Sequence, residues 1–226
     1  YTDMAIGLGN MFGFTLPENF NYPYISRSIT DFWRRWHMTL SQWFRTYVFF
    51  PLEFARRKSK LLRLPTDILI VFLLTGFWHG ANWNFLIWGG YFGLILAVEA
   101  SGWNRKLAKL PVFLQHTYSI ALILLGWVFF RLTDISQWGG FFGALFGHNG
   151  WTGSVNMRTL NVVFYLPIAL AAVLFATPIA AKLEQRLLAR FALARVWIDL
   201  VTLGLFVVTL CYLLANGFST FMYAQF

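Results

Sequence analysis

The 226-residue sequence has few charged side chains and a single cysteine. Asp, Glu, Lys and Arg make up 12% of the residues, whereas 58% are hydrophobic and 20% are aromatic. Soluble domains carry about 25% charged residues and cannot bury this much apolar surface. The composition therefore excludes ordinary soluble and disordered chains, and the lone Cys211 excludes an intrachain disulfide scaffold. We expect a membrane protein.

Acidic residues are scarcer than basic ones. There are 9 Asp and Glu against 18 Lys and Arg, which gives a formal net charge of +9. In a soluble protein such an excess suggests nucleic-acid binding, but no aromatic-basic RNA-binding signature and no zinc-ligand spacing accompany it. Lys and Arg also collect in the cytoplasmic loops of membrane proteins. We therefore interpret the positive charge as a sign of topology, with no nucleic acid as partner.

Four stretches contain no Asp, Glu, Lys or Arg, namely 68–98, 110–130, 159–181 and 200–226. Because a helix needs about 20 residues to cross the hydrocarbon core, the last three are single-span candidates. The first is too long for one upright span, and glycine, histidine and asparagine interrupt its middle. The interrupting residues are Gly76, His79, Gly80, Asn82 and Asn84. We expect two apolar arms joined by a polar break, which membrane depth tolerates inside protein or beside a cavity.

The basic residues support one arrangement of these segments. They are dense in three loops and sparse in the loop 131–158; the dense loops are 56–63, 105–109 and 182–195. If the dense loops are cytoplasmic, 68–98 enters and returns while each later segment crosses once. The pairs Gly76/Gly80 and Gly89/Gly93 also have the spacing of small residues at close helix contacts.

Two further segments are predicted to be interfacial or re-entrant helices. Within 30–47, tryptophan, leucine and tyrosine recur at spacings of 3 and 4, which predicts one continuous apolar helix face. Asp31 and Arg35 there form a favourable i,i+4 pair. Within 182–190, a basic residue at every fourth position predicts an amphipathic helix on the cytoplasmic surface. The segment 136–153, rich in glycine and aromatics, predicts a loop or short helix against the membrane.

His79 is the most informative of the four histidines. As a helix, the residues from Ile68 to Trp78 rise roughly 16 Å, about half of a ~30 Å hydrocarbon core, which places His79 near the membrane midplane. Ionisable groups at that depth are costly and usually functional. A neutral imidazole there suits a general base acting on a hydroxyl. The alternative is a structural histidine bonded to a carbonyl of the broken helix.

The other candidates have two interpretations each. His37 lies four residues after Trp33, on the flank of the aromatic stripe, where a packed polar side chain is the simpler interpretation. Arg34, Arg35 and Arg45 could hold the phosphates of an acyl donor or serve as interfacial anchors. Several other chemistries lack their motifs: no metal-binding histidine pair, nucleophile elbow or phosphate loop occurs. Carboxylates mark the ends of the apolar runs, which disfavours ion-coupled transport.

Two tryptophan-rich strings resemble the core of the membrane-bound O-acyltransferase family. They are DFWRRWHMTLSQWFRTYVFFPL at 31–52 and LLTGFWHGANWNFLIWGGYFG at 73–93. The resemblance runs in order over essentially the whole chain and is strongest to the bacterial branch of alginate O-acetylation. It implies an all-α fold, a polytopic transmembrane helical bundle with re-entrant and interfacial helices. Because the family has several spans before these motifs, we expect residues 1–226 to be the C-terminal catalytic portion of such a domain.

The resemblance also implies an activity. We expect an O-acyltransferase that moves an acetyl group from a cytoplasmic thioester, acetyl-CoA, toward hydroxyls of an exported polysaccharide, with no tightly bound cofactor and no metal. The family's invariant histidine falls on His79, and a second important histidine falls on His37. The expected supporting residues are Trp78 and Asn82 beside the histidines and Arg34 and Arg35 toward the donor. The expected partners are membrane lipid and an extracytoplasmic acyltransferase, in a bacterial cytoplasmic membrane.

The sequence departs from the family pattern at two places after His37. Thr46 stands where an acid is usual, and Glu53 and Phe54 stand where the branch has two glycines. Both departures concern the donor side. Two alternatives stay open: transfer of D-alanyl or another acyl group to a cell-envelope polymer, and a transporter or pore subunit without catalysis.

Overall fold

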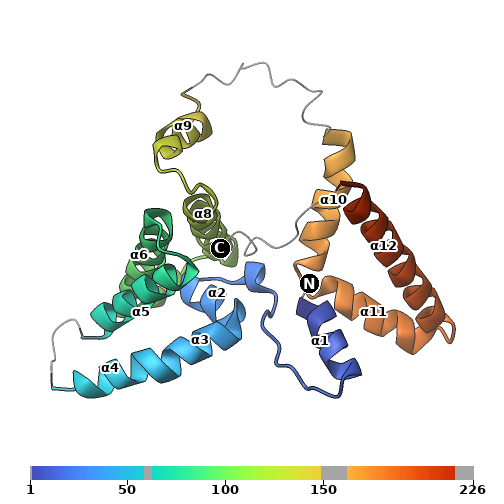
Figure 1. Ribbon diagram of the computed structural model, residues 1–226, viewed down its shortest axis with the longest axis horizontal. Helices are drawn as coiled ribbons and strands as arrows, with labels where there is room; N and C mark the ends of the chain where they lie inside the picture. The colour runs from blue at the N-terminus through green and yellow to red at the C-terminus, as the bar shows by residue number, and fades with distance from the viewer. Residues whose placement is uncertain (1, 59–62, 149–161, 217–226) are drawn as a thin grey trace. The chain divides into compact units, whose positions relative to one another are not determined.

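The computed structural model describes residues 2–58, 63–148 and 162–216, and every regular element in these ranges is helical (Figure 1). Three helical stretches are long and apolar enough to cross a membrane, namely Trp83–Leu107, Val112–Arg131 and Ala194–Ala215. A fourth candidate, 165–190, passes the same criteria only as a pair of bent helices. The predicted all-α, multi-pass membrane protein is confirmed.

The chain divides between Thr177 and Pro178 into two compact units. The helices of the first unit are α1 (Thr2–Met11), η1 (Pro23–Ile25), α2 (Ile29–Arg35), α3 (Met38–Phe44), η2 (Arg45–Phe49), α4 (Phe50–Ala55), α5 (Arg63–His79), α6 (Trp83–Val98), η3 (Glu99–Trp103), α7 (Asn104–Leu107), α8 (Val112–Arg131), α9 (Ser136–Leu145) and α10 (Val162–Phe175). Those of the second unit are α11 (Ile179–Arg190) and α12 (Ala194–Asn216).

The predicted broken hairpin over 68–98 is confirmed as α5 and α6, which lie against each other (Figure 1). Helix α5 ends at His79, and α6 begins at Trp83 after a three-residue break. Gly80 in the break has φ 151°, a backbone conformation that residues with a Cβ atom rarely adopt. The chain can therefore reverse direction directly after His79.

Glycines bring the two arms of the hairpin into close contact. A Cβ atom on Gly76 would collide with the carbonyl oxygen of Phe85, and one on Gly89 would collide with the carbonyl oxygen of Phe72. Small residues let helix backbones approach in this way. The predicted close contact therefore holds for Gly76 and Gly89, whereas Gly80 serves the reversal of the chain.

The core lies between α2, α6 and α8 and is largely aromatic. Its buried residues are Ile29, Phe32, Trp33, Trp88, Phe92, Leu96 and Ile123. The rings meet mainly edge to face, as for Trp33 with Trp88 and with Phe92, at centroid distances of 5.7 and 5.3 Å. Edge-to-face contacts of this kind add to the free energy of burial.

The predicted continuous helix over 30–47 is wrong. Helix α2 ends at Arg35 and α3 begins at Met38, because His37 takes a left-handed conformation with φ 47°. Backbone groups at the break bond to the preceding loop instead: the Asn21 N–H donates to the Arg35 carbonyl at 2.9 Å and the Met38 N–H to the Asn19 carbonyl at 3.0 Å. The stripe is consequently divided, with Trp33 buried and Trp43 and Tyr47 exposed.

Downstream, the predicted span 110–130 is confirmed as α8, and the predicted short helix within 136–153 is α9, although residues 149–153 lie outside the described part. The span predicted over 159–181 is wrong as a single helix. Helix α10 ends at Phe175, and α11 starts after Pro178, which lacks the N–H that a continuing helix needs. Residues 159–161 are not described.

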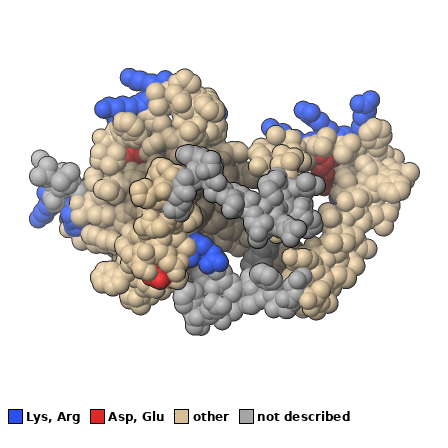
Figure 2. All heavy atoms as spheres, turned by 90° about the horizontal axis from the view of Figure 1, so that it is seen from above, with Lys and Arg blue, Asp and Glu red and all other residues tan. Residues whose placement is uncertain are grey.

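The last two predicted segments are confirmed in their helical character. Helix α11 contains the basic repeat 182–190, and α12 covers 200–216 of the last apolar run; residues 217–226 lie outside the described part. The described side chains of α12 are almost all exposed. Figure 2 shows a face that is mostly uncharged, with Lys and Arg gathered in a few clusters, as expected for a protein with large lipid-facing surfaces.

Candidate functional site

His79 is the last residue of α5 and lies buried among aromatic rings. Its ring meets those of Trp88 and Phe130 nearly at right angles, both at 5.1 Å between centroids. Phe85 lies at 6.2 Å, and the neighbouring Trp78 lies at 4.8 Å. Rings from α5, α6 and α8 therefore set the orientation of the imidazole, as a catalytic base requires.

Trp78 joins the two histidines predicted from the sequence. The rings of His37 and Trp78 are 6.2 Å apart and nearly perpendicular, while His79 packs on Trp78 as well. His37 reaches this position from the break between α2 and α3, so a tertiary contact brings together two residues distant in the chain. Trp78 is half exposed at 53%, whereas His79 behind it is buried.

Asn19 holds His37 in place, a role that sequence reasoning missed. The Asn19 Oδ1 accepts hydrogen bonds from the Thr39 N–H at 3.1 Å and the Thr39 hydroxyl at 3.0 Å. The same oxygen lies 3.3 Å from Nδ1 of His37. Because an amide oxygen can only accept, Nδ1 of the neutral ring donates, and the lone pair is left on Nε2. Burial lowers the pKa of the His37 imidazole below its usual value, which favours this neutral form.

Asn84 is a second residue whose role the sequence did not reveal. It is fully buried in the first turn of α6, and its Nδ2 donates to the carbonyls of Phe129 and Phe130 at 3.4 and 3.3 Å. These carbonyls belong to the last turn of α8, which has no intrahelical donors for them. Asn84 thus holds the end of α8 where Phe130 contacts His79. An asparagine inside an apolar run was the available signal.

Asn82, expected beside the histidines, has a different place. It is the N-cap residue of α6, its side chain makes no capping hydrogen bond, and it is exposed. Its backbone carbonyl accepts from the N–H groups of Phe85 and Leu86 at 3.2 and 3.4 Å. Asn82 therefore helps to start α6 after the break.

The arginines expected at the donor side are separated by the structure. Arg34 is exposed and lines a groove of about 470 Å³. The other polar residues of this groove are Ser41, Gln42, Arg45 and Thr46. Arg35 instead forms an ion pair with Asp31 at 2.9 Å, as the i,i+4 spacing predicted, and donates to the Asn21 carbonyl. The groove with Arg34 and Arg45, called the arginine groove below, can hold an anionic group.

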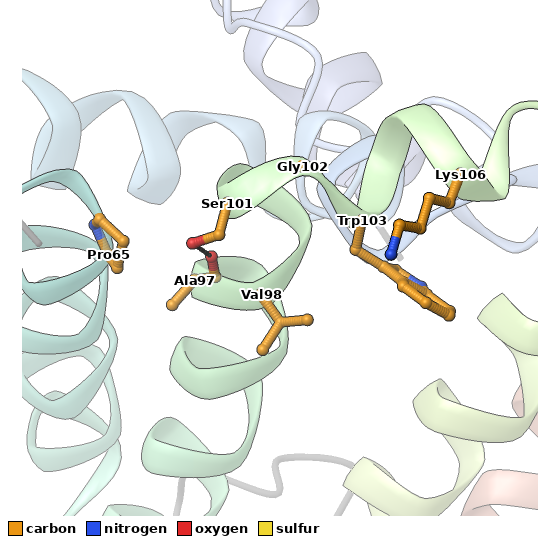
Figure 3. Close-up of a pocket in the computed structure, with 7 residues that line it drawn as sticks. All are labelled: Pro65, Ala97, Val98, Ser101, Gly102, Trp103 and Lys106. Atoms are coloured by element: carbon orange, nitrogen blue, oxygen red, sulfur yellow. Dashed lines mark hydrogen bonds between the residues drawn. The ribbon is translucent and has the colours of Figure 1, made fainter.

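A second groove, of about 450 Å³, lies where α6 continues into η3 and α7 (Figure 3). Pro65 of α5 faces it from the opposite side, and Lys106 lies over the ring of Trp103 at 6.0 Å. The Ser101 hydroxyl donates to the Ala97 carbonyl at 2.8 Å. With one cation and no histidine, this groove suits an anion less well than the arginine groove.

The two departures from the family pattern have definite positions. Thr46 lines the arginine groove. Glu53 forms an ion pair with Arg63 at 3.1 Å, and a second pair joins Arg56 to the buried Asp67. Both pairs tie α4 to α5. Within the described residues, no three His, Cys, Asp or Glu side chains are arranged to hold a metal ion.

Comparison with known proteins identifies related chains. The model of the membrane-bound O-acyltransferase family matches residues 1–134, which contain both histidines. The chain is 36% identical over 244 residues to a probable alginate O-acetylase of Pseudomonas putida, covering 100% of this chain and 50% of that protein. It is 44% identical over 140 residues to the peptidoglycan O-acetyltransferase of Helicobacter pylori, covering 61% of this chain and 26% of that protein.

A third relative is named for the transfer of a different acyl group, D-alanyl. The chain is 39% identical over 118 residues to the teichoic acid D-alanyltransferase of Bacillus subtilis, covering 49% of this chain and 30% of that protein. The alginate relatives are longer proteins, of which this chain spans between 29% and 50%.

Proposed function

The chain belongs to the membrane-bound O-acyltransferase family, and on this premise we propose that it carries the catalytic site of a polysaccharide O-acyltransferase. The observation that carries the proposal is the meeting of His37 and His79 on the ring of Trp78, inside an aromatic enclosure. Two imidazoles brought to the same aromatic ring suit proton transfer to and from a hydroxyl. The residues lie within the part of the chain that the family matches.

In the proposed reaction, His79 is the general base. It takes the proton of the acceptor hydroxyl while that oxygen bonds to the thioester carbonyl carbon. The carbon–sulfur bond then breaks, and the imidazolium returns the proton to the leaving thiolate. His37 orients the acceptor through the lone pair on its Nε2, because Nδ1 is engaged with Asn19. Where the acyl group is passed to a partner protein, His79 deprotonates the receiving hydroxyl of that partner.

The arginine groove is the proposed site for the phosphates of the donor, with acetyl-CoA as the first candidate. Arg34 and Arg45 supply two positive charges there, with neutral hydrogen-bonding side chains between them. Arg35 does not line the groove, and its ion pair with Asp31 lies within α2. The thioester is itself the activated acyl group, so the proposed reaction needs no tightly bound cofactor.

The relatives support a polymer of the cell envelope as acceptor. Their names state alginate, peptidoglycan and teichoic acid, and two of the three state O-acetylation. We therefore place acetyl transfer to an exported polysaccharide first, in a bacterial cytoplasmic membrane and with an extracytoplasmic acyltransferase as partner. The teichoic acid relative favours D-alanyl transfer as the second candidate.

The test uses the intact protein in membranes, supplied with isotopically labelled acetyl-CoA or a D-alanyl carrier and the polymer fraction of its host. We expect His79→Ala to lower acyl transfer by about 10²- to 10⁴-fold, the usual loss when a general base is removed. His37→Ala lowers it less, and His148→Ala, at an exposed position, leaves it unchanged. Mass spectrometry of the polymer separates acetyl from D-alanyl. Wild-type acylation in His79→Ala, at equal protein level, contradicts the proposal.

A further inference from the structure

Glu99 is a buried carboxylate that the proposed reaction does not use. It is 1% exposed and stands where α6 passes into the π-helical turn η3. Its Oε1 accepts from the Ile29 N–H at 2.9 Å and from the Tyr118 hydroxyl at 3.1 Å. Its Oε2 accepts from the Thr30 N–H at 2.7 Å and from the Thr30 hydroxyl at 2.6 Å. Four donors therefore converge on one side chain.

This arrangement makes Glu99 a cap for α2 that comes from another part of the chain. Ile29 and Thr30 are the first two residues of α2, so their N–H groups have no intrahelical acceptors. The N-cap residue, Ser28, accepts from the Asp31 N–H at 3.0 Å and leaves these two to Glu99. A negative charge at this end also interacts favourably with the helix dipole. Glu99 lies 70 positions after Ile29 and 69 after Thr30 in the sequence.

Helix α2 depends on such contacts because it is short. At 7 residues it is below the length at which an isolated helix is stable. It is held at its start by Glu99 and along one side by the aromatic core, through Phe32 and Trp33. Asn104 adds a bond from its Nδ2 to the Thr30 hydroxyl at 3.2 Å, beside Glu99.

The position of His37 follows from that of α2. Helix α2 rises roughly 9 Å from Ile29 to Arg35, and His37 lies two residues beyond its end. A tilt of α2 at its start would thus move the imidazole relative to Trp78 and His79. Displacements of about 1 Å at reacting groups can cost about 100-fold in rate.

We propose that Glu99 is a positioning residue for acyl transfer: by binding the start of α2 to α6 and α8, it holds His37 against Trp78 and His79. The proposal rests on the function proposed above for the two histidines. Glu99 has no direct part in the chemistry. A glutamine is the informative substitution, because it keeps the shape but offers one oxygen and an N–H₂ group to donors that need acceptors.

The first experiment measures amide hydrogen exchange in the intact protein and does not depend on any activity. Hydrogen bonds to a charged group contribute about 1.5–3 kcal/mol, so Glu99→Gln should speed exchange at Ile29 and Thr30 by roughly 10- to 100-fold. The proposal requires faster exchange also at Met38, whose N–H bonds to Asn19 beside His37. A change confined to Ile29 and Thr30 would show a local cap and overturn it.

Matched variants keep this experiment interpretable. Glu184→Gln makes the same chemical change at an exposed position on α11 and should leave all of these amides unchanged. Thr30→Val and Tyr118→Phe each remove one of the four bonds and leave the carboxylate in place. They should give a smaller acceleration at Met38, which decides the question if Glu99→Gln does not fold. Protection at Met38 equal to wild type in both variants contradicts the proposal.

The second experiment asks whether Glu99 acts through His37. Glu99→Gln should lower acyl transfer by at least 10-fold in the wild-type background and by less than about 2-fold in His37→Ala, since coupled residues are not additive. Equal losses in both backgrounds contradict the proposal. If the residual rate of His37→Ala is too low to compare, exchange at Met38 decides. If the wild-type protein transfers no acyl group, the proposed function is wrong. Amide hydrogen exchange at Met38 still tests whether Glu99 anchors α2.

Discussion

Two apolar helices of similar length, one in each compact unit, differ in how much of their surface is buried. Of the 18-residue apolar segment within Trp83–Leu107, 44% is buried inside the protein. The corresponding segment within Ala194–Ala215 is 0% buried. The packed helix is the less hydrophobic of the two, because it contains Asn84, Glu99 and close-packed glycines. In a membrane, apolar helices gain little from leaving lipid, so packing of small residues and hydrogen bonds decide which helices associate.

Polar and small residues are concentrated in the part of the chain that contains the proposed site. Around α6 the polar side chains bond to groups far away in sequence: Asn84 to α8 and Glu99 to α2. In α12 the hydroxyl of Thr209 bonds to the Leu205 carbonyl one turn earlier in its own helix. Long-range bonds of the first kind join the elements around His37 and His79. Four matched pairs of substitutions test the contrast.

The largest effect is expected for Phe92→Ala. Phe92 is fully buried in the aromatic core, and its ring lies over Gly126, so truncation leaves a cavity and should cost about 3–5 kcal/mol of unfolding free energy. Phe206→Ala, at a ring that is half exposed on α12, should cost much less. Unfolding in mixed detergent, followed by tryptophan fluorescence, measures both. Equal losses would remove the distinction between the two helices.

The next effect concerns the glycines. Gly76→Ala places a Cβ atom against the carbonyl oxygen of Phe85, a backbone atom that cannot turn away. Overpacking of this kind costs about 1–3 kcal/mol. Gly204→Ala adds the same atom to α12, where nothing described lies within 4 Å, and should shift stability by about 0.5 kcal/mol or less. Thermal unfolding of the two variants side by side checks the difference, and a tolerated Gly76→Ala would contradict the close contact.

The third pair compares two ion pairs. Asp67 is fully buried beside Arg56, whereas Asp199 and Arg195 are more than 60% exposed. Asp67→Asn should cost about 1–3 kcal/mol, less than the about 3–5 kcal/mol of a fully buried pair, because Arg56 can turn toward water. Asp199→Asn should cost about 0–1 kcal/mol. Raising the salt concentration should weaken the second pair far more than the first, and the same unfolding assay measures this.

The smallest effect compares a long-range with a local hydrogen bond. Asn19→Ala removes the acceptor of the Thr39 N–H and hydroxyl, with an expected cost of about 1 kcal/mol. Because Asn19 also holds His37, acyl transfer should fall more than stability does. Thr209→Ala removes one bond within α12 and should leave both nearly unchanged. If Asn19→Ala kept wild-type acyl transfer, the reaction would not depend on the position in which Asn19 holds His37.

Part of the site could be predicted from the sequence. His79 stood out because an ionisable residue near the middle of a long apolar run is rare without a function, and the tryptophan-rich strings marked His37. Hydrophobic periodicity reports which face of a local segment is apolar. It contains no information on Asn19 or Asn84, whose hydrogen-bond partners lie 18 to 46 residues away.

The two wrong predictions have related physical causes. The spacing of 3 and 4 over 30–47 is genuine, yet the helix breaks at His37. The Arg35 carbonyl and the Met38 N–H have no helical partners at the break, and they bond instead to Asn21 and Asn19 of the preceding loop. The run 159–181 contains no charged residue, yet Pro178 separates two helices. In the first case a tertiary contact overrides a local pattern, and in the second a backbone restriction overrides hydropathy.

Composition and local sequence pattern indicate a helical membrane protein, the positions of its apolar segments and two candidate histidines. These properties depend on composition and on neighbours within a few turns of a helix. Tertiary structure alone decided the left-handed turn at His37, the meeting of His37 and His79 on Trp78, and the capping of α2 by Glu99. Each of these depends on hydrogen bonds and ring contacts between residues that are distant in the chain, and such contacts leave no periodic trace in a sequence.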